Sequence, residues 1–177
     1  HSFATTSLFR STESTAGIRL YDCSGCLLSG NNVTGNAEGI MFVYSSDNIV
    51  SGNSIAHEGV GLGFETSDNN TLSGNNITDI WDYGILMYTS FGNSIFHNNL
   101  VNNSQHAISY QSLNGFDRGY PAGGNYWSDY NGTDVFSGRY QNETGSDGIG
   151  DTQYTVDGNN ADKYPLISIW IRIPGDV

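Results

Sequence analysis

The chain has 177 residues, a formal net charge of −12 and a pI near 4.3, which argue against nucleic acids and anionic membrane surfaces as partners. Its 23 glycines, 20 asparagines and scarcity of helix formers predict an all-β protein with many short strands and turns. With 37% hydrophobic residues and no apolar run long enough for a membrane span, we expect one domain that folds around its own core.

The N-terminal segment, residues 1–16, is rich in Ser and Thr and contains no amphipathic helix pattern. It predicts an N-terminal arm or an irregular first coil. The sequence begins at His1 without an initiator methionine or signal peptide, so we expect a processed or excised chain.

Cys23 and Cys26 form the motif CSGC. A zinc site would need a second pair of ligands, and a thioredoxin-like site would need a neighbouring helix, which the sequence does not predict. We therefore expect a local disulfide, with two packed thiols as the alternative.

The main pattern is a repeat. Similar segments begin at Gly17, Gly39, Gly61 and Gly84, and a shorter copy begins at Ala107, which gives steps of 22, 22, 23 and 23 residues. Two apolar slots recur: Ile18, Ile40, Leu62, Ile85 and Ile108, then Leu20, Phe42, Phe64, Met87 and Tyr110. No copy has room for a helix, so each is expected to form one 22–23-residue coil of a parallel β-solenoid.

Asparagine recurs with the same period. One slot, expected to point inward, holds Asn31, Asn53, Asn75 and Asn98, and a second slot at a turn holds Asn48, Asn70 and Asn93, with Cys26 in the first coil. Stacked asparagines can hydrogen-bond along the stack and to turn backbones. These residues therefore have a structural explanation rather than a catalytic one.

The segments GGNYWSDYNGTD and SDGIGDTQYTVDGNNADKYPLI follow the coils. Together with the repeat, they resemble the NosD-like right-handed parallel β-helix proteins, which are common among surface and exported proteins of archaea. The resemblance implies a right-handed β-helix over residues 17–116, a C-terminal cap over 117–166, and an extracellular or cell-surface location. The chain departs from the copper chemistry of the family name, because it lacks a Cys- or Met-rich copper pattern among Met41, Met87, His57, His97 and His106.

One edge of the predicted solenoid carries acidic and aromatic side chains in the last turn of each coil: His57, Glu58, Asp79, Trp81 and Asp82. Carboxylates beside an aromatic ring suit glycan binding or cleavage. A lyase would also need a basic residue, and none falls in this row. Turns on an acidic, solvated surface also hold Asp, Glu and Asn without binding a ligand. These five residues are therefore candidates for carbohydrate binding, with a polysaccharide lyase or glycoside hydrolase as a further alternative, and no residue is assigned a catalytic role.

The cap contains a segment that resembles a calcium loop, with Glu143, Asp147, Ile149 and Asp151 as the candidate ligands. Glu143 and Gly145 replace two of the expected acids, so an acidic turn without metal is the alternative, and no cofactor is required. Glycosylation sequons occur at Asn32, Asn69, Asn76, Asn102, Asn131 and Asn142.

Residues 167–177 extend beyond the cap and alternate apolar with polar side chains, which predicts an extra β-strand. Its candidate assembly residues are Ile167, Ile169, Trp170, Ile171 and Ile173. We expect this strand to be donated to a neighbouring copy, which would give a non-enzymatic structural subunit of a surface filament or layer. Two alternatives stay open: the strand covers the apolar patch Met41, Val43, Leu86 and Tyr88 of its own solenoid, or the protein is a carbohydrate-binding or polysaccharide-processing module.

Overall fold

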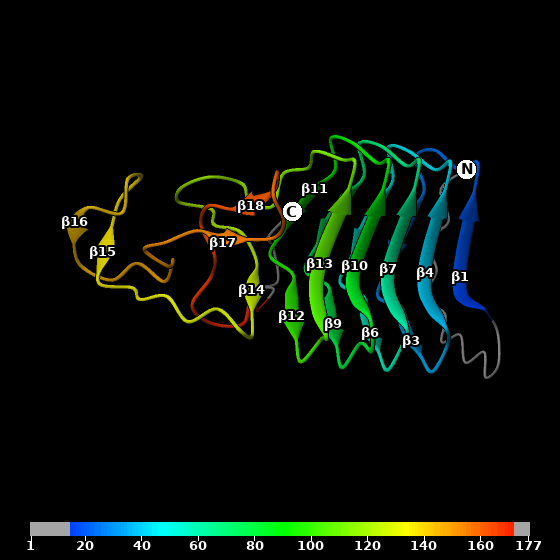
Figure 1. Cartoon of the computed structure of the whole chain (residues 1–177), viewed down its shortest axis with the longest axis horizontal. Helices are drawn as coiled ribbons and strands as arrows, with labels where there is room; N and C mark the ends of the chain where they lie inside the picture. The colour runs from blue at the N-terminus through cyan, green and yellow to red at the C-terminus, as the bar shows by residue number, and fades with distance from the viewer. Residues whose placement is uncertain (1–14, 172–177) are drawn as a thin grey trace.

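The computed structural model describes residues 15–171, which form strands and turns without a helix. Successive coils stack along one axis, with β1 (Ala16–Tyr21) at one end and the C-terminal cap at the other (Figure 1). The predicted all-β parallel solenoid is therefore confirmed. Among the described residues, no helix is long and apolar enough to cross a membrane.

Three parallel sheets form the sides of the solenoid. The first has the order β1-β4-β7-β10-β13, and its further strands are β4 (Glu38–Val43), β7 (Val60–Glu65), β10 (Tyr83–Tyr88) and β13 (Gln105–Tyr110). The second contains β2 (Leu27–Ser29), β5 (Ile49–Ser51), β8 (Thr71–Ser73) and β11 (Ser94–Phe96). The third contains β3 (Asn32–Thr34), β6 (Ser54–Ala56), β9 (Asn76–Thr78), β12 (Asn99–Val101) and β14 (Tyr126–Trp127).

Like residues stack over like residues in the core, as the repeat predicts. Ile40 pairs with Leu62, and the rings of Phe42 and Phe64 stack with their centroids 4.7 Å apart. The inward apolar residues of the central coils are almost completely buried. Each coil therefore buries an apolar surface that it could not bury alone.

The predicted register of the last coil is wrong by one residue. Ile85 pairs with Ala107, so the final step is 22 residues rather than 23, and Ile108 and Tyr110 do not point into the core. The small side chains of Ala107 and Ser109 point inward instead, because the cap fills this end of the core with the large side chains of Phe116 and Trp127.

A row of glycines lets consecutive coils approach closely. A Cβ on Gly39, Gly61 or Gly84 would contact a backbone carbonyl oxygen of the next coil. The row ends at His106, which takes the position of Gly84 in the last coil. Among the described strands none stacks on β13 beyond this point, so the His106 imidazole has room to extend toward the cap.

Both predicted asparagine ladders are present, and each ends in the cap. Along the inward ladder each Nδ2 donates to the Oδ1 of the next rung, in the order Asn31, Asn53, Asn75, Asn98, Asn125. Asn125 then donates to the carboxylate of Asp162. The turn ladder continues beyond Asn93 through Asn114 to Asn160, whose Nδ2 donates to Asp157. The structural explanation of the asparagines therefore holds.

The cap adds two antiparallel hairpins beyond β14. One is formed by β15 (Phe136–Ser137) and β16 (Glu143–Thr144), the other by β17 (Tyr154–Thr155) and β18 (Ala161–Asp162). The β15–β16 hairpin lies at the opposite end of the molecule from β1 (Figure 1). The β17–β18 hairpin brings Asp162 back to the end of the coils.

The described part of the predicted extra strand, residues 167–171, pairs with no strand within residues 15–171, and Ile173 lies outside the described residues. Trp170 packs over Gly74 and exchanges two backbone hydrogen bonds with the Asn99 side chain, 2.7 and 2.9 Å long. These contacts hold Trp170 beside β9 and β12, on the third sheet, rather than on the Met41–Tyr88 patch of the first.

Candidate functional site

The turns that follow the third sheet form a stacked row on the surface. His57, Asp79 and Asn102 each follow a strand of this sheet and adopt the left-handed conformation, with φ from 53° to 57°. Asn and Asp tolerate this conformation better than most residues, which favours them at the position. Their side chains therefore lie one above another at the edge of the solenoid.

This row lines an open pocket of about 450 Å³, here called the turn groove, together with Ile80, Trp81 and Ser104. Trp81 is 65% exposed, so its indole is available to a ligand. The structure thus brings together three of the five residues predicted for carbohydrate binding: His57, Asp79 and Trp81. Asn102, which the repeat also places in this row, and Ser104 add further polar groups to the lining.

Glu58 and Asp82 do not line this groove. Glu58 is fully buried and accepts hydrogen bonds from the backbone and side chain of Asn36. Burial raises its pKa, although the bonds from Asn36 oppose that shift. Glu58 is therefore a structural rung between coils, and its assignment to the carbohydrate site is corrected. Asp82 is exposed beyond the groove.

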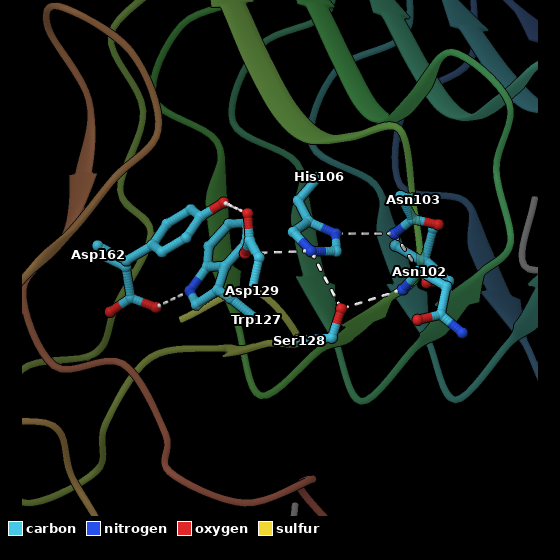
Figure 2. Close-up of polar contacts among 9 residues, drawn as sticks. Asn102, Asn103, His106, Trp127, Ser128, Asp129 and Asp162 are labelled. Atoms are coloured by element: carbon cyan, nitrogen blue, oxygen red, sulfur yellow. Dashed lines mark hydrogen bonds and ion pairs between the residues drawn. The ribbon is translucent and has the colours of Figure 1, made fainter. Parts of the chain in front are cut away.

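A second polar cluster lies where the coils meet the cap (Figure 2). The Nε2 atom of His106 is 3.2 Å from both the Ser128 hydroxyl and the Asp129 carboxylate. Its Nδ1 atom is 3.2 Å from the Asn103 amide nitrogen. Burial lowers the pKa of His106, and the Asp129 charge partly opposes this shift.

This cluster resembles a Ser–His–Asp arrangement, but its hydrogen bonds do not activate the serine. Asn103 donates from Nδ2 to Ile77 O and accepts at Oδ1 from the Ile80 N–H, which fixes its amide orientation. Its Nδ2 therefore donates to His106 Nδ1, and the proton of the neutral ring lies on Nε2. An Nε2–H group cannot remove a proton from Ser128, so His106 here joins the last coil to the cap.

Asp162 is the most buried carboxylate of the cap. It accepts a hydrogen bond from Trp127 Nε1 (Figure 2) and two more from the backbone N–H groups of Asn125 and Tyr164, at 2.7 to 3.0 Å. Burial raises its pKa to about 7 despite these bonds. Its carboxylate also occupies the space that a side chain on Gly124 would need. The GGNYW and NNADKYPL segments are thus explained as the two sides of one buried junction.

The predicted calcium loop is a network of hydrogen bonds within the protein. Asp151 accepts from the N–H groups of Val135 and Phe136, and Asp147 accepts from Gly138 N–H, whereas Glu143 lies on the separate strand β16. Over residues 15–171, no three His, Cys, Asp or Glu side chains are placed to hold a metal ion. The structure therefore does not bring the four candidate ligands, Glu143, Asp147, Ile149 and Asp151, together as a calcium site.

Cys23 and Cys26 form the expected disulfide. It closes the turn at the first position of the turn ladder, where Asn48 accepts a hydrogen bond from the Cys26 N–H. All six sequon asparagines, Asn32, Asn69, Asn76, Asn102, Asn131 and Asn142, are exposed, and their glycosylation stays a prediction.

Comparison with known proteins gives one family. The family model described as "Periplasmic copper-binding protein (NosD)" matches residues 2–132. Because this match covers most of the chain, the chain belongs to that family. The family description indicates an exported protein. No curated protein and no solved structure matches significantly.

The described residues do not fit a copper site. His97 is bonded through Nε2 to Ala122 O, both ring nitrogens of His106 have partners, and Met87 is buried in the core. His57 lies apart from them on the exposed turn row. The family description names copper binding, but these side chains do not form a copper site.

Proposed function

We propose that this exported member of the NosD family is a non-enzymatic β-helix module that binds carbohydrate in the turn groove. The observation that carries the proposal is the exposed indole of Trp81 beside Asp79, His57 and Asn102. An aromatic face can pack against the C–H groups of a sugar ring, while carboxylate and amide groups bond its hydroxyls. The stacked turns would repeat the polar contacts, from His57, Asp79 and Asn102, along a chain.

The groove suits binding better than cleavage. Glycoside hydrolysis needs two carboxyl groups on either side of the scissile bond. Of the residues that line the groove, Asp79 alone has a carboxylate, since Glu58 is buried in the wall below. The proposed location is extracellular or at the cell surface, where glycans are available as partners.

The test compares binding of neutral oligosaccharides, such as cellotetraose, by calorimetry in the full chain and two variants. Trp81→Ala should weaken binding by about tenfold or more, because it removes the aromatic face. Tyr140→Ala is the matched control, since Tyr140 is 79% exposed in the cap and should have no effect. Absence of binding to a panel of neutral glycans, or equal binding by the Trp81 variant, would contradict the proposal.

Self-assembly is the second candidate function. Ile169 and Ile171 are 55% and 73% exposed, and β1 pairs only with β4 among the described strands. A tail donated to the β1 end of another copy would cover both surfaces and build a head-to-tail filament or layer. Electron microscopy of the chain beside a form ending at Leu166 tests this: filaments formed only by the longer chain would support it, and monomers from both would exclude it.

A further inference from the structure

A second groove, here called the tail groove, lies against the outer face of β5 and β8. It has a volume of about 390 Å³, within the range of ligand pockets. Its walls include Phe96, His97, Arg118 and Trp170, and its floor includes Thr71 and Ser73. None of its lining residues also lines the turn groove, so the two are separate places on the solenoid.

Three distant segments build this groove and fix one another. Trp170 comes from the tail, and its ring stacks on His97 with the centroids 5.1 Å apart. His97 is held by Ala122 O of a cap loop at 2.7 Å, and the same loop is closed by the hydrogen bond from Arg118 N–H to Gly123 O. The aromatic walls are therefore set in place before a ligand arrives, which lowers the entropy cost of binding.

The charge of the groove is opposite to that of the protein. Its lining contains a guanidinium and an imidazole but no carboxylate, although the net charge of the chain is −12. The Arg118 guanidinium lies 4.8 Å above the Phe96 ring and forms no ion pair with any described carboxylate. The adjacent Asp117 carboxylate instead accepts the N–H groups of Gly119 and Lys163. Arg118 is thus available to an anionic group.

Hydroxyl groups line the floor in register. Ser51 and Ser73 pair on adjacent strands, so their hydroxyls recur at the coil spacing of about 4.8 Å. The aromatic side chains of the walls can pack against a sugar ring, and the hydroxyl groups of the floor can bond its hydroxyls. The guanidinium of Arg118 can bind an anionic substituent on that ring. We propose that the tail groove binds an acidic saccharide, with the ring against Trp170 and its carboxylate or sulfate group at Arg118.

The test titrates the full chain with tetragalacturonate and with a sulfated tetrasaccharide, each beside neutral cellotetraose. Arg118→Gln should weaken binding of at least one acidic ligand by about tenfold or more, because a charge-assisted hydrogen bond is lost. Arg139→Gln is the matched control: it changes the net charge equally, but Arg139 is exposed in the cap outside the groove. Trp170→Ala should weaken the same binding, which tests the aromatic wall.

The outcomes distinguish acidic binding in the tail groove from neutral binding in the turn groove. Trp81→Ala should leave acidic binding unchanged, whereas Arg118→Gln should leave neutral binding unchanged. Equal losses in the Arg118 and Arg139 variants would show a general charge effect and would overturn the proposal. Failure of both acidic ligands to bind would also overturn it, whatever the result with cellotetraose.

Discussion

The backbone N–H of Asn125 donates a 2.7 Å hydrogen bond to the buried carboxylate of Asp162. Asn125 is the last rung of the inward ladder, whose side-chain amides all donate in the direction of the cap. The carboxylate therefore receives the positive end of a row of aligned amide dipoles, as an anion does at a helix N-terminus. This contact joins the repeating part of the chain to the irregular part.

Asp162 should make the stability of the protein depend on pH. Its pKa is raised from 3.8 to about 7 by burial, so the native state binds the proton more tightly than the unfolded state. The resulting stability is fully present below about pH 4 and is lost as the pH rises through about 7, by up to roughly 4 kcal/mol. Urea unfolding of the parent chain and Asp162→Asn between pH 4.5 and 8 should show this loss only in the parent. The same pH dependence in both would contradict it.

Replacing a central rung of the ladder should be costly. Asn75 is fully buried and accepts from the N–H and Nδ2 of Asn53, while its own Nδ2 donates to Val50 O and Asn98 Oδ1. Asn75→Ala leaves these groups unpaired, and we expect the free energy of unfolding to fall by roughly 3–5 kcal/mol.

The matched control for this prediction is Asn32→Ala, at an exposed asparagine in the first coil. We expect a change within about 0.5 kcal/mol. Both variants would be produced without glycosylation and compared by denaturant unfolding. Similar small losses for the two would mean that the ladder contributes little to stability.

Gly124 should tolerate no side chain. A Cβ at this position would overlap the Asp162 carboxylate, which is held in place by Trp127 Nε1 and two backbone groups. We expect Gly124→Ala to lower the free energy of unfolding by at least about 2 kcal/mol. Gly158→Ala, in the same cap but with open space at the Cβ position, should be within about 0.5 kcal/mol of the parent. Thermal unfolding would show whether the two substitutions differ as expected.

His106 should be neutral at pH 7 and protonated on Nε2. Burial lowers its pKa, and the Asn103 amide supplies a donor to Nδ1. Long-range nitrogen–proton NMR of the ring resolves the two tautomers. Detection of an Nδ1–H tautomer, or of an imidazolium at pH 7, would remove the argument that this histidine cannot activate Ser128.

The sequence by itself determined the repeating part of the protein. The 22-residue period, the apolar slots and the asparagine slots are each repeated several times, so a mismatch in one coil does not change the predicted solenoid. The same reasoning failed at Ile108, where the repeat meets the cap: the inward position belongs to Ala107 because Phe116 and Trp127 fill the core there.

Only the tertiary structure decided which side chains form sites. The sequence placed Glu58 with Trp81, but the two neighbouring turn positions point to opposite sides of the wall, so one is buried and the other exposed. The tail groove combines Phe96, Arg118 and Trp170, which are not related by the repeat or by any motif in the sequence. The physical reason is that periodic contacts are encoded locally, whereas a site at the cap depends on where a non-repeating chain returns to the solenoid.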